Sequence, residues 1–110
     1  MMEAIKIPIY LSEKRRQEPI YIVDDSTIPI AAEFKDAGNS LDGAEVIVYA
    51  KSGDAVQFAN CTVNGKTAVF TPSSDFFAPG RNRMQYEIGG RAISFAVDVI
   101  CAKRISKGGT

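Results

Sequence analysis

Short runs in which apolar and polar residues alternate recur along the chain, and helical periodicity is nearly absent. Alternation indicates half-buried β-strands, because successive side chains of a strand point to opposite faces. Turn-forming residues separate the runs at intervals of about ten residues, a spacing typical of a β-sandwich or barrel. The pattern predicts strands at residues 5–11, 20–23, 27–34, 45–51, 55–63, 66–72, 82–88 and 91–100.

The alternation also predicts which side chains share one face of a strand. Three such sets are Ile5, Ile7, Ile9 and Leu11; Met84, Tyr86 and Ile88; and Ile93, Phe95, Val97 and Val99. Pro8 cannot donate a hydrogen bond to a neighbouring strand, so we expect the first strand either to lie at the edge of a sheet or to break at the proline.

Glycine-containing dipeptides predict two hairpin turns. Asn64-Gly65 is the strongest signal, because both residues tolerate the positive φ of a type I′ turn, and Gly89-Gly90 is the second. Residues 73–80 are too short and too broken for a helix. We expect at most one helical turn there, with Phe76 and Phe77 inserted into one end of the core.

These elements predict an all-β fold, an immunoglobulin-like antiparallel β-sandwich of seven to nine strands. The chain has 110 residues, the size of one domain. We therefore expect a single domain over residues 1–105 and a flexible tail over 106–110. The absence of tryptophan disfavours an antibody-type domain. An oligonucleotide-binding barrel is a weaker alternative, because its usual five strands are fewer than the pattern predicts.

Composition excludes several classes of chemistry. The chain has no histidine, which removes serine–histidine and cysteine–histidine nucleophile pairs and histidine-ligated zinc. We therefore expect no enzymatic activity. Thirteen basic and thirteen acidic residues balance, whereas nucleic-acid binders are normally strongly basic. No run approaches the roughly 18–20 apolar residues that span a bilayer, and the first residues lack the features of a signal peptide.

The candidate ligand residues are few. Cys61 and Cys101 are too far apart in sequence for a zinc motif, and we expect both to be reduced and buried. Asp24, Asp25 and Asp42 would be the donors of a calcium site, but without the spacing of an EF-hand loop we interpret them as turn-forming residues. No metal and no cofactor are therefore expected.

One basic group and the distribution of charge remain to be explained. Arg81, Arg83 and Arg91 lie on one expected hairpin near Tyr86, which would suit single-stranded nucleic acid, although a solvated hairpin face explains the pattern better. The net charge is +2 over residues 1–16, −6 over 17–75 and +4 over 76–110. If the first and last strands are neighbours, the two positive segments share one side and orient the module in an assembly.

Five short motifs occur in a recognisable order between residues 20 and 100. They are Asp24-Asp25 before TIPIAAEF, Ser40-Leu41-Asp42-Gly43 before EVIVYAK, Asn64-Gly65-Lys66 before TAVFTP, Pro79-Gly80 before RMQYEI, and a terminal ISFAVDV. This order resembles the N-terminal domain of phage baseplate upper proteins, found in tailed phages of Gram-positive hosts. The resemblance implies an immunoglobulin-like module that fastens a baseplate or tail-fibre component to the distal ring of the tail.

The expected function is therefore that of a non-enzymatic structural protein of the virion, assembled in the host bacterial cytoplasm. It would dock through strand edges and loops onto tail or baseplate proteins in a symmetric homo-oligomer, without nucleic acid or membrane. Arginine and aromatic side chains dominate interface energetics. The expected contact residues are Arg15, Arg16, Tyr21, Phe76 and Phe77. The alternative is an adhesin-like cell-surface module that binds carbohydrate or protein, which would need a concave face with exposed aromatic side chains.

Overall fold

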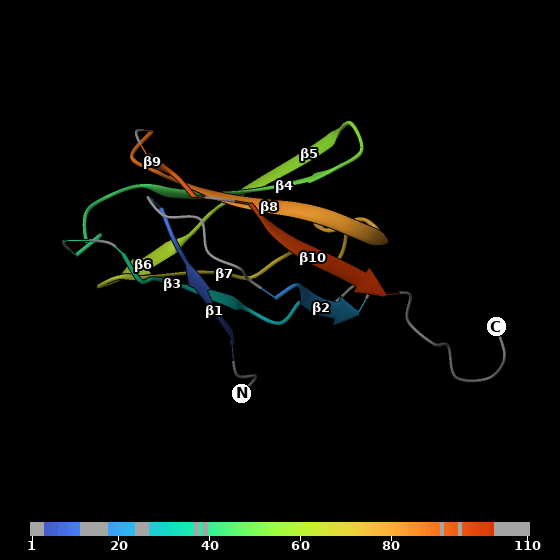
Figure 1. The fold of residues 1–110 in the computed structure, drawn as a ribbon, viewed down its shortest axis with the longest axis horizontal. Helices are drawn as coiled ribbons and strands as arrows, with labels where there is room; N and C mark the ends of the chain where they lie inside the picture. Colours follow the sequence, from blue (N-terminus) through green and yellow to red (C-terminus); the bar gives the residue numbers. More distant parts are fainter. Residues whose placement is uncertain are drawn as a thin grey trace, which may run out of the picture.

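The computed structural model describes residues 4–11, 18–23, 27–36, 38, 40–90, 92–94 and 96–102. Within these residues the chain is all-β, and its strands form two sheets packed face to face as a sandwich (Figure 1). Nine strands have three residues or more and a tenth has two, in agreement with the expected number. The expected tail over 106–110 lies outside the described residues.

The smaller sheet has four strands in the order β1-β3-β7-β6. Their bounds are β1 Ile5–Ile9, β3 Ile30–Phe34, β7 Thr67–Phe70 and β6 Thr62–Asn64. The first strand is an edge, which is one of the two outcomes expected from Pro8. It runs parallel to β3, with Ile5 opposite Ile30 and Ile9 opposite Phe34.

The larger sheet has the order β2-β10-β8-β4-β5, and β9 pairs with the far end of β8. The bounds are β2 Ile20–Val23, β10 Val97–Ala102, β8 Gly80–Ile88, β4 Val46–Ser52, β5 Ala55–Asn60 and β9 Ala92–Ile93. In Figure 1 β4, β5 and β8 lie above the smaller sheet, β10 slopes down to β2 beside it, and the β4–β5 hairpin extends away from the rest of the sandwich.

The core lies between the sheets and is filled by alternate residues of both. Ile9, Ile30 and Phe34 come from the smaller sheet, and Val48 and Tyr86 come from the larger. At one end Phe76 and Phe77 enter the core beside Phe70, as the sequence predicted. Alternation along each strand therefore placed the inward side chains correctly over most of the chain.

Two parallel pairs correct the expectation of an antiparallel sandwich. β1 is parallel to β3, and β2 is parallel to β10. The first strand is therefore not a neighbour of the last, and it is β2 that takes this place. Most of the charged residues in the two positive segments lie outside the described residues, so the proposed charge polarity stays a prediction.

The last expected strand is also corrected, because residues 91–100 do not form one continuous strand. β9 ends at Ile93, and β10 begins only at Val97. Val97 and Val99 are buried as expected, but Ile93 is 57% exposed, so the strand break removes it from their face. The hairpin at Asn64-Gly65 is present with its two-residue loop one position later, because Asn64 already pairs with Thr67. The glycine at the start of this loop, Gly65, has φ +64°.

Candidate functional site

The structure divides the expected contact residues into three groups. Tyr21 lies on β2 with its side chain 73% exposed. Phe76 and Phe77 are only 6% and 5% exposed, so they belong to the core and we do not keep them as contact residues. Arg15 and Arg16 lie outside the described residues. Of the five, only Tyr21 is placed at the surface by the structure.

The outer face of the larger sheet can be traced by register from the middle of β4. Val46, Val48 and Ala50 are buried, so the alternate residues Ile47, Tyr49 and Lys51 point outward. Residues opposite one another in a ladder point to the same side of a sheet. The outward residues of the neighbouring strands follow from this rule.

Large apolar side chains are exposed at the margins of this face. Phe58 lies opposite Tyr49, and Val56 lies opposite Lys51. At the other margin Tyr21 lies opposite Ile100. In β10 the neighbours of Ile100, Val99 and Cys101, are buried, so Ile100 and Tyr21 point outward. The exposed large apolar residues of the described chain are Tyr21, Val23, Val56, Phe58 and Ile93, and the ladders place all five on this outer face.

The outer face of the smaller sheet differs in kind. Its outward residues are Lys6, Pro8, Ala31, Glu33, Thr62, Asn64, Thr67 and Val69. None of these is an exposed large apolar residue. A monomer exposes single apolar side chains at many places, and it is their concentration on one face that makes this face a candidate for an interaction surface. The outer face of the larger sheet is therefore the candidate functional site, and we call it the docking face.

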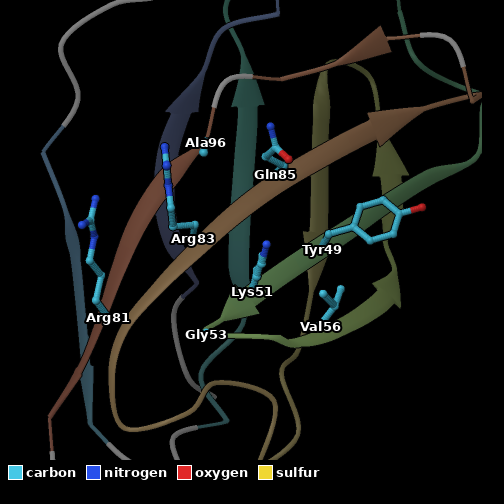
Figure 2. A pocket seen from close by; sticks show the side chains of 8 residues that line it. All are labelled: Tyr49, Lys51, Gly53, Val56, Arg81, Arg83, Gln85 and Ala96. Carbon is cyan, nitrogen blue, oxygen red and sulfur yellow. The ribbon is translucent and has the colours of Figure 1, made fainter.

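Basic side chains occupy the middle of the docking face. Arg81 and Arg83 on β8 and Lys51 on β4 point to the same side, as Figure 2 shows. Asp98 accepts hydrogen bonds from Nε and Nη2 of Arg81, both at 3.2 Å, and its Oδ1 lies 3.9 Å from Nε of Arg83. Asp98 thus neutralises part of the charge of the two arginines, and Glu87 on β8 is the other outward carboxylate. Three cations against two carboxylates leave this part of the face positive.

A shallow hollow of about 630 Å³ lies over this basic centre (Figure 2). Arg81, Arg83 and Gln85 line one side, and Tyr49 and Val56 line the other. The hydroxyl of Tyr49 donates to Oε1 of Glu87 at 3.3 Å, and its ring lies 6.4 Å from that of Phe58. Desolvation, with a smaller contribution from Glu87, raises the pKa of Tyr49 above its usual value. Tyr49 is therefore a neutral hydrogen-bonded side chain at neutral pH.

The structure does not support the possible binding surface for single-stranded nucleic acid, because its aromatic residue is not accessible. Tyr86 is fully buried, so it has no exposed ring on which a base can stack. The side chain of Arg91 lies outside the described residues. The remaining arginines, Arg81 and Arg83, share Asp98.

Among the residues considered as metal ligands, Asp42 has structural partners instead. Asp42 accepts a hydrogen bond from the amide of Gly65 at 3.0 Å and another from Ser40, and both hold its pKa below the usual value. Asp24 and Asp25 lie outside the described residues, and those that are described contain no group of three metal-ligating side chains. Cys61 and Cys101 form no disulfide with one another. Burial raises the pKa of Cys61 to about 12.

The most exposed part of the docking face, the strand β5, carries none of the contact residues that the sequence indicated. A signal was present, because residues 55–64 contain no charged side chain. An uncharged run is ordinary in a buried central strand. It indicates an interaction surface only because β5 lies at the edge of the sheet, which the sequence does not show.

No protein-family model matches the chain, and no curated protein matches it. Within its described part the chain has no helix long and apolar enough to cross a membrane. The assignment of a function therefore rests on the docking face and on the resemblance given by the sequence.

Proposed function

We propose that the chain is a non-enzymatic structural module that binds another protein subunit through the docking face. The observation that carries this proposal is that the exposed large apolar residues of the described chain all lie on one side of one sheet. Protein interfaces combine buried aromatic and arginine side chains with a polar surround. Tyr21, Phe58, Arg81 and Arg83 supply these residue types.

The charge on the docking face defines the chemistry of the partner. Arg81 and Arg83 share the carboxylate of Asp98, and Lys51 lies opposite Arg83 on the neighbouring strand. With Glu87 on β8 as the other outward carboxylate, the three cations outnumber the two anions. A partner surface that presents carboxylates opposite this basic centre, with apolar side chains opposite Tyr21 and Phe58, is complementary in both charge and polarity. Complementary charge fixes the register of docking and rejects surfaces of the same sign.

The order of the strands supports an immunoglobulin-like assignment for the fold. The smaller sheet, β1-β3-β7-β6, corresponds to the order A-B-E-D of that fold. The strands β10-β8-β4-β5 of the larger sheet correspond to G-F-C-C′. The parallel pairing of β1 and the additional strand β2 distinguish this chain from the usual arrangement.

The resemblance to the N-terminal domain of phage baseplate upper proteins supplies the biological setting. We propose that the module fastens a baseplate or tail-fibre component to the distal ring of a phage tail, within a virion that is assembled in the bacterial cytoplasm. Its gene should then lie among genes for tail assembly. A gene placed among unrelated metabolic genes would contradict this setting.

Binding is tested with the purified chain and the tail-ring protein encoded beside it. We expect a stoichiometric complex by native mass spectrometry, weakened at least tenfold by Arg83→Glu or by Tyr21→Glu. Lys6→Glu on the outer face of the smaller sheet is the matched control, because Lys6 is also exposed, and it should leave the affinity unchanged. A complex that is insensitive to Arg83→Glu and Tyr21→Glu would remove the docking face from the proposal.

The adhesin-like alternative makes a different prediction for the same face. Flat stacking of a sugar ring needs exposed aromatic side chains at the hollow, where Tyr49 is the only aromatic lining residue and its ring is tilted 40° from that of Phe58. Binding of the isolated chain to a glycan array, abolished by Tyr49→Ala, would favour the adhesin over the structural module.

A further inference from the structure

We infer that β5 is a dimerisation edge, at which two copies of this chain pair their β5 strands antiparallel across a two-fold axis. The larger sheets of the two copies would then join into one continuous sheet. This inference goes beyond binding to a different protein and does not depend on it, because it concerns the isolated chain.

The edge formed by β5 lacks the features that usually prevent strand pairing. Natural edge strands are protected by charged residues, by proline or by being very short. β1 carries Lys6 and Pro8, β6 has three residues, and β2 has four and follows Glu18-Pro19. β5 has six residues, Ala-Val-Gln-Phe-Ala-Asn, with neither charge nor proline. Among the edge strands of the described chain, β5 is therefore the one without such protection against pairing.

The side chains of β5 are exposed on both faces of the sheet. Ala55, Val56, Gln57 and Phe58 are all exposed, because this end of the β4–β5 hairpin extends away from the sandwich (Figure 1). Val56 is 54% exposed and Phe58 is 67% exposed. A second copy of the hairpin alongside would cover both side chains without moving the core.

The backbone of β5 presents its free hydrogen-bonding groups at alternate residues. The amide of Cys61 donates to the carbonyl of Val46 at 2.9 Å, which fixes the phase of the β4–β5 ladder. Alternate residues of an antiparallel pair exchange hydrogen bonds, so the amides of Gln57 and Ala59 point toward β4. Those of Val56, Phe58 and Asn60 point outward from the sheet.

This phase selects one register for the dimer. If the two-fold axis passes beside Phe58, each Phe58 lies opposite its own copy, and Val56 lies opposite Asn60 of the second copy. All outward groups of the three residues are then paired, in about six inter-chain hydrogen bonds. The two Phe58 rings become cross-strand neighbours, and each keeps its contact with Tyr49.

The symmetry of this contact limits the assembly to a dimer at this edge. An isologous contact uses the same surface on both copies, so pairing occupies both β5 edges and leaves none to extend. No like charges meet at this edge, because β5 carries none. The docking faces of the two copies would lie on the same side of the joined sheet.

The first test measures the mass of the purified chain by sedimentation velocity from 1 to 500 μM. We expect a reversible monomer–dimer equilibrium. Phe58→Lys places two cations opposite one another and should raise the dimer dissociation constant at least tenfold, and Val56→Lys should raise it as well. Tyr21→Lys is the matched control, since it makes the same change at an exposed side chain of another strand, and it should leave the equilibrium unchanged. Circular dichroism checks that each variant folds.

The second test uses the unmodified chain and is independent of whether any variant folds. Amide hydrogen exchange at Val56, Phe58 and Asn60 should slow as the concentration rises, whereas Gln57 and Ala59 should be protected at every concentration. A strictly monomeric mass at 500 μM would overturn the inference. So would a dimer in which these alternating amides stay unprotected, or growth beyond the dimer through β5.

Discussion

The rings of Phe34 and Tyr86 meet edge to face across the core, with their centroids 5.6 Å apart and their planes at 90°. Phe34 lies on β3 of the smaller sheet and Tyr86 on β8 of the larger, so this contact joins the two layers. Both side chains are almost completely buried. The pair is therefore a sensitive point at which to test how the sandwich is held together.

Removing the Phe34 ring should destabilise the protein strongly. We expect Phe34→Ala to lower the free energy of unfolding by about 3–5 kcal/mol, because it removes buried apolar surface and leaves a cavity between the sheets. Tyr86→Phe is the conservative comparison, since the Tyr86 hydroxyl has only the Sδ atom of Met84 as a partner, at 3.9 Å. Urea unfolding measures both, and equal losses would contradict the packing described here.

Tyr86 should also make the protein sensitive to alkali. Burial raises the pKa of its hydroxyl well above the usual value. Above about pH 10 the unfolded chain loses this proton while the folded chain keeps it, so stability should fall as the pH rises. Tyr86→Phe should lose less stability than the unmodified protein between pH 9 and 11. Parallel pH profiles for the two proteins would argue against a buried, neutral Tyr86.

Asn82 should contribute to the stability of the fold, because it is buried and hydrogen-bonded to the backbone. Its side chain is 1% exposed; it accepts from the amide of Ala78 at 3.0 Å and donates to the Ala78 carbonyl at 2.8 Å. Asn82→Ala leaves these buried groups unpaired and should cost about 1–3 kcal/mol in thermal or urea unfolding. Asn64→Ala, at an exposed asparagine of β6, is the control and should change stability by less than about 0.5 kcal/mol.

Asp42 should contribute stability that disappears in acid. Its carboxylate accepts the amide hydrogen of Gly65 and thereby ties the loop before β4 to the turn between β6 and β7. Because its folded pKa is lowered from 3.8, this contribution is present above that pH and is lost as the pH falls through the folded value. Asp42→Ala should therefore be less stable than the unmodified protein at pH 6, and the difference should shrink as the pH falls below 3.8. A stability difference that does not shrink in acid would mean that the ionised carboxylate is not its cause.

Cys61 should react slowly with thiol reagents in the folded protein. The thiolate is the reactive form, and burial raises the pKa of Cys61 to about 12. At pH 8 we expect alkylation of Cys61 to be at least a hundredfold slower in the native state than in 6 M guanidinium chloride, followed by mass spectrometry of the Cys61 peptide. Fast native labelling would mean that the surroundings of Cys61 open readily.

Local patterns predicted most strands but not their partners. Alternation identified Met84 and Tyr86 as core residues, because the period of a strand depends only on its own geometry. The same alternation wrongly placed Ile93 on the buried face of Val97 and Val99, because β9 ends at Ile93 and β10 begins only at Val97. The candidate site was predicted only at Tyr21, since an exposed and a buried apolar side chain look alike in sequence.

By itself, the sequence determined that this protein is all-β and where most of its strands lie, and the turn before β7 was predicted to within one residue. Those properties follow from residue type and from neighbours a few positions away. The tertiary structure alone decided that β1 runs parallel to β3, that β2 runs parallel to β10, and that Tyr21 and Phe58 share one exposed face. The reason is physical: burial depends on which distant strand lies alongside, and the local sequence does not specify that strand.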